Sequence, residues 1–264
     1  MSSYKADDPA AYELSMGRWS RRLAPLFLQF TNIKAASRIL DVGCGIGSLS
    51  FVLREAFPNA SITGLDYSQA FVDYARSRAG DGNLHFERGD AAALAYGDAQ
   101  FDATLSLLML NFVPAAEKAG IEMKRVTKPG GVVSAAVWDF KGGLTFLRVL
   151  ADTAAVLDAS GETFRSQQFS APLTAPGELA SAWSKMGLKD VAQTSLTIRM
   201  EFTSFADYWT PWLGGQGTVG AYIMSLDAVL RDQLESHMRR AYLAGSGDGP
   251  RSFAATAWAV RGIV

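Results

Sequence analysis

The chain has 264 residues, of which 48% are hydrophobic and 19% are charged, a composition typical of a globular protein rather than a disordered one. Lys and Arg number 25 against 26 Asp and Glu, so we expect neither nucleic acid nor an anionic membrane as a partner. The single cysteine, Cys44, excludes an intramolecular disulfide and a cysteine-based zinc site, and two histidines argue against a metallohydrolase. The chain shows no signal-peptide pattern and no apolar run of about 18 residues, so we expect a cytoplasmic protein without membrane insertion.

The first half of the chain alternates between two kinds of pattern. Apolar side chains at helical spacing predict a first helix over residues 9–30. Strands are then expected at 37–42, 61–65, 85–88, 101–107 and 132–138, and helices at 47–57, 69–79 and 115–126. This alternation is typical of βαβ units, which form a parallel sheet with helices on both faces.

The rhythm changes after residue 140. Helices are expected at 144–160, 176–187 and 221–242, an irregular stretch at 164–172, and strands at 195–202 and 252–260. The glycine-rich residues 128–131 are expected to form a turn before the strand at 132–138.

A glycine loop between the first strand and the next helix is the strongest local signal. The strand contains Asp41, and Gly43, Gly45 and Gly47 follow at every second position. Such glycines allow a tight turn and a close approach of a ligand to the backbone. The dinucleotide fingerprint fails because its sixth position is Ser48, and a phosphate P-loop fails because no Gly-Lys-Ser/Thr follows.

Two further acidic residues follow the next two strands. Asp66 lies 19 residues after Gly47 and ends the second strand, and Asp90 follows the third. The carboxyl ends of parallel strands meet at one crevice, so the three carboxylates are expected to face it. A carboxylate at Asp66 can accept hydrogen bonds from both hydroxyls of a ribose.

Five motifs in register carry a resemblance to a known family. They are DVGCGIG at 41–47, LDYS at 65–68, GDA at 89–91, FDATLS at 101–106 and KPGG at 128–131. Together they resemble the class I S-adenosylmethionine-dependent methyltransferases. The resemblance implies an α/β, Rossmann-like, seven-stranded, mostly parallel sheet, with an antiparallel seventh strand between the fifth and sixth and a helical and aromatic insertion before strand six.

The resemblance also implies a division of the chain and a set of cofactor residues. We expect an N-terminal helical cap at 1–36, a cofactor-binding core at 37–140, a helical insertion at 141–194, and strands with a lid or helix at 195–264 that complete the same domain. The methionine part of the cofactor is expected against Asp41, Gly43, Cys44 and Gly45, with Arg18 reaching its carboxylate and backbone carbonyls of Ser106 and Leu107 facing its ammonium. The ribose is expected on Asp66, and the adenine beside Tyr67, Asp90 and Ala91.

Residues on the acceptor side are left with alternatives. Asn111 after the fourth strand either touches the acceptor or caps its loop. His237 is the one plausible histidine base, expected on the apolar face of the last long helix, and is alternatively a partly buried structural residue. Three aromatic residues in the glycine-rich segment 205–220 either form a lid or pack in the core, and Trp138 either lines the same pocket or packs in the core. The three are Tyr208, Trp209 and Trp212.

The function expected from the resemblance is methyl transfer from S-adenosylmethionine to a small molecule, with S-adenosylhomocysteine as product. The motif style is similar to the branch with quinone-biosynthesis C-methyltransferases and natural-product O- or N-methyltransferases. With so few histidines and one cysteine, we expect no metal in the transfer. Two alternatives stay open: a methyltransferase acting on tRNA or protein, and a non-catalytic member that only binds the cofactor. The sequence sets neither the acceptor nor the oligomeric state.

Overall fold

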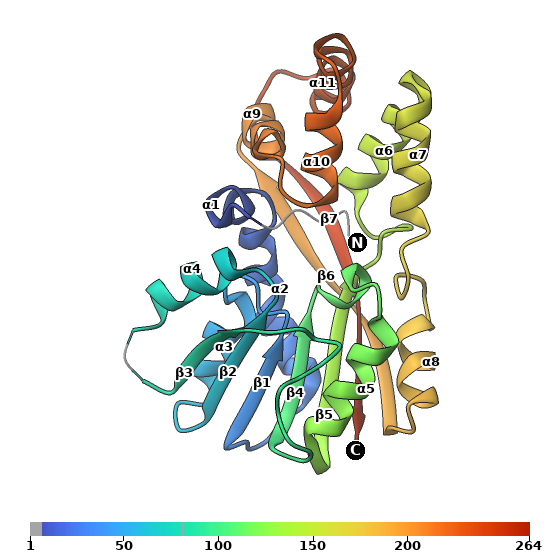
Figure 1. The fold of residues 1–264 in the computed structure, drawn as a ribbon. Helices are drawn as coiled ribbons and strands as arrows, with labels where there is room; N and C mark the ends of the chain where they lie inside the picture. Colours follow the sequence, from blue (N-terminus) through green and yellow to red (C-terminus); the bar gives the residue numbers. More distant parts are fainter. Residues whose placement is uncertain (1–6, 81) are drawn as a thin grey trace.

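A seven-stranded sheet organises the residues described by this computed structural model, which are 7–80 and 82–264 (Figure 1). The strand order is β3-β2-β1-β4-β5-β7-β6, and β7 runs antiparallel to both of its neighbours while β1 to β5 pair in parallel. The strands are β1 (Arg38–Val42), β2 (Ser61–Asp66), β3 (Leu84–Arg88), β4 (Phe101–Leu107), β5 (Thr127–Trp138), β6 (Lys189–Phe202) and β7 (Arg251–Ile263). The predicted sheet, including the antiparallel seventh strand between the fifth and sixth, is confirmed.

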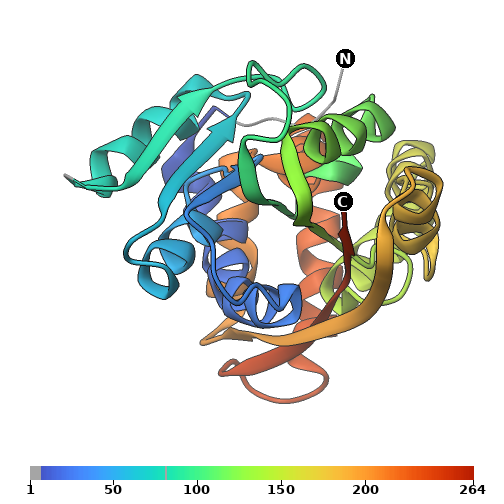
Figure 2. The same cartoon turned by 90° about the horizontal axis from the view of Figure 1, so that it is seen from below.

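Helices cover both faces of this sheet (Figures 1 and 2). Consecutive residues of β1 point to opposite faces. Ile39 belongs to the core cluster that includes residues of α2, α3 and α4, and Leu40 to the cluster that includes residues of α5 and α8. The helices of the first half are α1 (Pro9–Tyr12), the π-helix η1 (Glu13–Gly17), α2 (Arg18–Thr31), α3 (Ser48–Ala56), α4 (Gln69–Ala79), the 3-10 helix η2 (Leu110–Phe112) and α5 (Ala116–Val126). Within the described ranges, no helix combines the length and the apolar character needed to cross a bilayer.

The second half adds helices around the antiparallel strands. Before β6 come α6 (Thr145–Leu157), α7 (Ala159–Phe169) and α8 (Glu178–Lys185). Between β6 and β7 come α9 (Phe205–Trp209), the 3-10 helix η3 (Thr210–Gly214), α10 (Gly217–Ser225) and α11 (Ala228–Leu243). Helices α6, α7, α10 and α11 rise together beyond the carboxyl ends of the parallel strands (Figure 1).

Two strands begin earlier than predicted. Residues 128–131 do not form a separate turn but an irregularity inside β5, because Gly130 N–H donates to the Val264 carbonyl and Val264 N–H to the Gly131 carbonyl. Strand β6 begins at Lys189, although its first six residues are largely polar. It is the edge strand of the sheet, so these side chains are exposed or half-buried and carry little hydrophobic signal.

Two helix predictions were wrong. Residues 164–169, expected to be irregular, belong to α7, whose first turn is capped by the Asp158 carboxylate accepting from Gly161 N–H at 2.9 Å. The single helix expected at 221–242 is two helices. Helix α10 ends at Ser225, and Asp227 starts α11 by accepting a hydrogen bond from Leu230 N–H at 2.9 Å.

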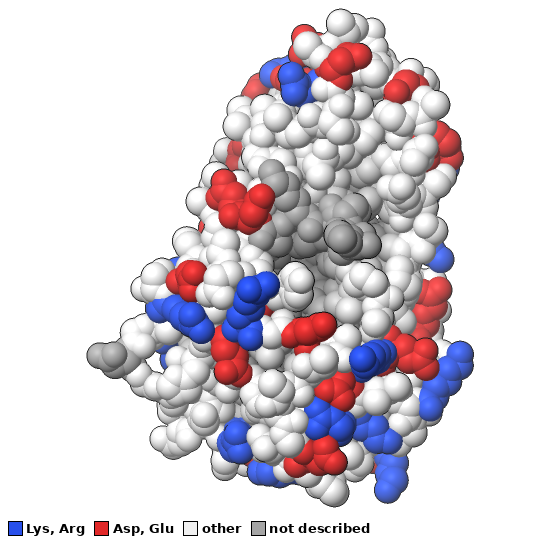
Figure 3. Space-filling view, viewed as in Figure 1, with Lys and Arg blue, Asp and Glu red and all other residues white. Residues whose placement is uncertain are grey.

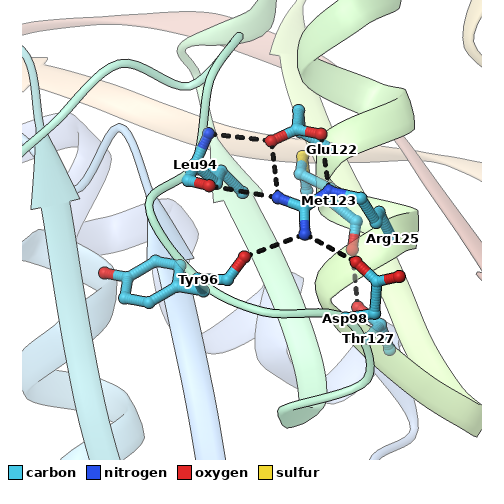
Figure 4. Close-up of polar contacts among 7 residues, drawn as sticks. All are labelled: Leu94, Tyr96, Asp98, Glu122, Met123, Arg125 and Thr127. Atoms are coloured by element: carbon cyan, nitrogen blue, oxygen red, sulfur yellow. Dashed lines mark hydrogen bonds and ion pairs between the residues drawn. The ribbon is translucent and has the colours of Figure 1, made fainter.

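Arg125 on α5 fixes the long connection between β3 and β4 (Figure 4). Its guanidinium donates to the carbonyls of Leu94 and Tyr96 at 3.0 and 2.8 Å, and it binds Glu122 through two nitrogens at 2.7 Å each. Glu122 in turn accepts from Leu94 N–H at 2.9 Å. The hydrogen bonds from Arg125 hold the pKa of Glu122 below its usual range. This network anchors the connection that begins with Asp90 and Ala91 at the carboxyl end of β3.

Candidate active site

Three loops at the carboxyl ends of β1, β2 and β3 border a cavity of about 730 Å³. They comprise residues 43–47, 66–68 and 89–91, and parallel pairing of the three strands brings them to one edge of the sheet. The end of β4 and the segment after it form another wall, and Tyr12 of α1 also lines the cavity. The wall residues are Leu107, Leu108, Met109, Phe112, Val113 and Pro114. The cavity is large enough for a cofactor of nucleoside size.

The glycine loop forms the floor of this cavity. Gly43 and Gly45 have φ angles of +74° and +55°, which glycine adopts without strain. A Cβ at Gly43 would lie 2.3 Å from the Met109 Cγ, whereas a Cβ at Gly45 would meet only the Phe71 Cδ2 at 4.0 Å. Gly45 therefore presents bare backbone to open space in the cavity, as close contact with a ligand requires.

The Asp66 carboxylate ties two of the loops together. Its Oδ2 accepts from Gly45 N–H at 2.8 Å and its Oδ1 accepts from Ser68 N–H at 2.9 Å. Burial of the carboxylate raises its pKa, although the backbone hydrogen bonds oppose the shift. Each oxygen retains lone-pair capacity beyond its backbone contact, so Asp66 can still accept hydroxyl groups from a ligand.

Asp41 is fully buried beneath the glycine loop. Its Oδ2 accepts from the Ser50 hydroxyl at 2.6 Å, while its Oδ1 has no hydrogen-bond partner in the part of the chain that the structure describes. Desolvation raises the pKa of Asp41 to about 7, and the nearby Asp66 carboxylate adds to the rise. A buried carboxylate with one unpartnered oxygen on a cavity wall is a ready acceptor for a cationic or hydrogen-bonding ligand group.

A smaller cavity of about 50 Å³ adjoins the large one. Tyr12, Leu108 and Phe112 line both, so the two cavities share a wall. The other lining residues of the smaller cavity come from η1, the end of β5, the loop between β5 and α6, α6, α7 and the segment from η3 to α10. They are Ser15, Met16, Trp138, Phe140, Leu144, Phe146, Leu147, Gln168, Trp212, Gln216, Gly217, Thr218 and Val219.

Comparison with known proteins agrees with this geometry. A family model described as a methyltransferase domain matches residues 39–131, which include the glycine loop, Asp66 and Asp90. The chain is 39% identical over 117 residues to a demethylmenaquinone methyltransferase of Thermus thermophilus, covering 43% of this chain and 51% of that protein. It is 32% identical over 131 residues to a fatty-acid O-methyltransferase of Mycolicibacterium smegmatis, covering 48% of each. The chain thus spans about half the length of these relatives.

Solved structures extend the likeness of fold to nearly the whole chain. The YcgJ protein of Bacillus subtilis superposes with a TM-score of 0.59 at 19% identity, over 92% of this chain and 97% of that one. A phosphoethanolamine N-methyltransferase of Haemonchus contortus, solved with phosphomonomethylethanolamine and S-adenosylhomocysteine, gives 0.60 at 17% identity, over 97% of this chain and 56% of that one. The chain therefore has the fold of the class I methyltransferases, and its residues 39–131 match a methyltransferase domain.

The large cavity fits S-adenosylmethionine by its own chemistry. Gly45 leaves open space where a side chain would otherwise stand, and Asp41 presents an unpartnered carboxylate oxygen for a cationic group. Asp66 stands at the carboxyl end of the next strand with acceptor capacity for ribose hydroxyls. The cavity therefore offers acceptors for the charged amino-acid end and for the sugar of one ligand.

Most of the predicted cofactor residues line the large cavity. They are Asp41, Gly43, Cys44, Gly45, Asp66, Tyr67, Asp90, Ala91 and Leu107. Tyr67 is 72% exposed at the rim, with the Arg88 guanidinium 5.5 Å from its ring centre. Burial raises the pKa of the Cys44 thiol, which keeps it protonated and inert. The individual roles of these residues toward the cofactor stay predictions.

Ser106 and Arg18 are not among the residues that line the large cavity. Ser106 is fully buried in β4, one residue before Leu107. The Arg18 guanidinium donates to the Asp207 carboxylate at 2.7 Å and to the Asp207 carbonyl at 3.0 Å, and it stacks 4.4 Å from the Trp19 ring centre. For Arg18 to reach the methionine carboxylate, its ion pair with Asp207 would have to break.

The acceptor-side residues divide between cavity, core and surface. Trp138 and Trp212 line the smaller cavity, whereas Tyr208 and Trp209 pack in the hydrophobic core beside Phe205. Within the segment 205–220, Trp212 and residues 216–219 line the smaller cavity, and a lid role for them stays a prediction. Asn111 lies in η2 between Leu110 and Phe112; it is buried, lines neither cavity, and both its amide atoms lack a partner among the described residues.

The predicted position of His237 was wrong. The buried face of α11 consists of Leu234, Met238 and Tyr242, and His237 is exposed beside Arg240. It lines neither cavity. His237 follows Leu230 by seven residues, but Leu230 itself is only half-buried, so this helical spacing does not place His237 on the apolar face.

Several cavity residues had no signal in the sequence motifs. Tyr12 and Phe71 face each other with ring centres 5.0 Å apart, although they lie on α1 and α4. Met109 follows β4 and packs over Gly43. These residues come from segments between the motifs, and only the tertiary arrangement brings them to the glycine loop.

The raised pKa of Asp41 predicts an unusual pH dependence of stability. The folded, cofactor-free protein keeps the Asp41 proton up to about pH 7, whereas the unfolded chain releases it near the ordinary value of 3.8. Since the folded state binds the extra proton, the contribution of Asp41 to stability falls as pH rises from about 4 to about 7.

The measurement is chemical denaturation of the wild type and Asp41→Asn at several pH values. The stability of Asp41→Asn relative to the wild type should rise by roughly 3 kcal/mol between pH 5 and pH 8. Asp232→Asn on the exposed surface of α11 is the control and should show no such trend. A pH-independent difference for Asp41→Asn would contradict the raised pKa.

Proposed function

We propose that this protein transfers the methyl group of S-adenosylmethionine to a small-molecule acceptor, without a metal. The observation that carries the proposal is a pair of adjacent cavities. One has glycine backbone and carboxylates for a nucleoside cofactor, and the other lies across the wall formed by Tyr12, Leu108 and Phe112. The matched relatives are named for methyl transfer to demethylmenaquinone and to fatty acids, both small molecules.

In this proposal the glycine loop and the unpartnered Asp41 oxygen bind the methionine part of the cofactor. Asp66 accepts the ribose hydroxyls, while Asp90 and Ala91 meet the adenine. Asp90 is exposed and its Oδ1 accepts from Ala92 N–H at 2.8 Å, which orients its carboxylate at the rim. Tyr12 lines the same cavity, with its ring centre 5.0 Å from that of Phe71.

Chemically, the cofactor supplies a methyl group already activated on a sulfonium. The residues of the chain position the acceptor against this methyl group and exclude water. Holding the two reactants in this geometry is the source of the rate acceleration. Among the described residues lining the smaller cavity there is no Asp, Glu, Lys, Arg or His. In this proposal no side chain of the smaller cavity acts as a strong base toward the acceptor.

The surface charge supports a small acceptor over a nucleic acid. On the face seen in Figure 3, Lys and Arg side chains lie among Asp and Glu side chains, and neither sign forms a continuous patch. An RNA-binding face would need a basic surface that follows phosphates. We also propose that the protein acts in the cytoplasm.

Calorimetry with S-adenosylhomocysteine tests the proposal directly. We expect one site per chain, together with S-adenosylmethionine or S-adenosylhomocysteine in the eluate of the denatured protein by mass spectrometry. Production of S-adenosylhomocysteine in the presence of an acceptor would then separate an enzyme from a member that only binds the cofactor. A protein that binds neither form of the cofactor would overturn the proposal.

A further inference from the structure

The smaller cavity has a lining that cofactor binding does not explain. We propose that this cavity is the part of the active site that binds the methyl acceptor, which we call the acceptor arm. It binds an apolar group of an acceptor that carries no charge. The inference rests on the proposed function, because the arm is defined by the wall it shares with the cofactor cavity. The argument uses the chemistry of the lining, its size and one unpartnered donor.

The lining is apolar and aromatic. Phe146 and Trp212 stack with ring centres 5.4 Å apart and an interplanar angle of 14°, and Phe112 lies 6.0 Å from Phe140. Trp138 ends β5 beside them and is buried. The described lining of the larger cavity, in contrast, includes Asp41, Asp66, Arg88 and Asp90. Charge is thus found on the cofactor side only.

The polar side chains of the smaller cavity are largely bound to one another or to the backbone. The Thr218 hydroxyl donates to Gln168 Oε1 at 3.0 Å. Gln216 Oε1 accepts from the N–H groups of Asp7 and Asp8, and its Nε2 donates to the Asp7 carboxylate at 2.8 Å. Of these groups only the Asp7 carboxylate carries a charge, and Asp7 is not among the residues that line the cavity. Burial of an unpaired charge costs far more than an apolar contact gains, so this lining selects against charged acceptors.

The size of the cavity limits what enters it. A dry apolar cavity that binds benzene measures about 150 Å³, and this one has about a third of that volume. It therefore takes one apolar group of an acceptor, of a few heavy atoms, while the rest lies at the wall of Tyr12, Leu108 and Phe112. The reacting atom is then on the cofactor side of that wall.

One donor in the lining has no partner. Trp212 is 4% exposed, and its indole N–H makes no hydrogen bond within the described chain. Buried donors in proteins are nearly always satisfied, so an unpartnered one beside a cavity calls for a ligand atom or a water. An acceptor with an uncharged oxygen near its apolar end would satisfy Trp212.

Three phenols of nearly equal size test the preference for an uncharged group. They are 4-methylphenol, 4-hydroxybenzylammonium and 4-hydroxybenzoate, which differ in the charge of one substituent. Calorimetry on the protein saturated with S-adenosylhomocysteine should show 4-methylphenol binding at least tenfold more tightly than either charged analogue. Equal or tighter binding of the ammonium would overturn the proposal and assign the rings to a cation cage. Equal binding of the carboxylate, or no binding of 4-methylphenol, would overturn it as well.

Variants of α10 and α6 test the location. Val219→Phe fills the smaller cavity and should weaken the binding of 4-methylphenol at least tenfold. The affinity for S-adenosylhomocysteine should stay within twofold of the wild-type value, because Val219 does not line the larger cavity. Met224→Phe on the same helix is 47% exposed in the wild type and should change neither affinity. Phe146→Ala enlarges the cavity and should shift preference from 4-methylphenol to 4-propylphenol.

The outcomes separate this inference from the proposed function. If Val219→Phe leaves the affinity for 4-methylphenol unchanged while S-adenosylhomocysteine still binds, the smaller cavity is not the acceptor site. The proposed function stands in that case. If the wild type does not bind S-adenosylhomocysteine, the proposed function fails. The acceptor arm is then tested in the cofactor-free protein. Val219→Phe should bind 4-methylphenol more weakly than the wild type does, and equal binding would overturn the assignment of the arm.

Discussion

Gly45→Ala will weaken binding of S-adenosylhomocysteine at least a hundredfold while the protein stays folded. The new Cβ would project into the large cavity, where its nearest described neighbour is the Phe71 ring at 4.0 Å, so the cofactor-free fold has room for it. The φ angle of +55° is strained for alanine and should lower the free energy of unfolding by about 1 kcal/mol. A hundredfold loss of affinity corresponds to about 2.7 kcal/mol, so the effect on binding exceeds the effect on stability.

Gly177→Ala is the matched control. Gly177 also has a positive φ angle, +82°, and nothing described lies within 4 Å of a Cβ added there. It precedes α8 and lines neither cavity. Calorimetry should therefore show an unchanged affinity for S-adenosylhomocysteine, with a loss of stability similar to that of Gly45→Ala. An unchanged affinity in Gly45→Ala as well would mean that the cofactor does not lie against the glycine loop.

Asp66→Asn should also weaken S-adenosylhomocysteine binding about a hundredfold, for two reasons that add. The amide nitrogen would face either Gly45 N–H or Ser68 N–H, donor against donor, and so release one of the two loops. It also removes the charge that accepts the ribose hydroxyls, and hydrogen bonds to charged groups contribute about 1.5–3 kcal/mol. Asp90→Asn, at an exposed position, should cost less than tenfold.

The ribose contact can be separated from the loop contact by changing the ligand. In the wild type, adenosine should bind more tightly than 2′,3′-dideoxyadenosine, because only adenosine has hydroxyls for Asp66. In Asp66→Asn the two nucleosides should bind with about equal affinity, even if the variant binds both of them more weakly than the wild type does. If the wild-type preference for adenosine persists in the variant, the hydroxyls are bound elsewhere and the assignment of Asp66 is wrong.

The parallel half of the fold could be read from the sequence because its signals are local. β4 and α4 were predicted with the bounds that the structure has, since buried strands read as continuous apolar runs and polar caps such as Ser68 mark helix starts. The glycine loop was recognisable because a positive φ at Gly43 and Gly45 leaves little choice of residue. These are backbone requirements, and they restrict the amino acid directly.

The acceptor side could not be read in the same way, because its features depend on contacts distant in sequence. Asp227 as a helix cap divides what periodicity alone predicted as one helix, and the orientation of α11 then exposes His237. Arg18 pairs with Asp207, which lies 189 residues away. The core positions of Tyr208 and Trp209 depend on packing with Phe202 and Phe205. No spacing rule within one segment contains this information.

The origins of the two cavity linings have a consequence for how acceptor choice evolves in this protein. Of the sixteen described residues around the smaller cavity, only Leu108 and Phe112 fall within the span 39–131 that matches the methyltransferase domain. The larger cavity takes nearly all of its lining from that span. The two tasks are therefore encoded in separate stretches of the gene. On the proposed function, mutations in α6 or around α10 should change the acceptor while leaving the cofactor bound, whereas changes at Tyr12, which lines both cavities, should affect both.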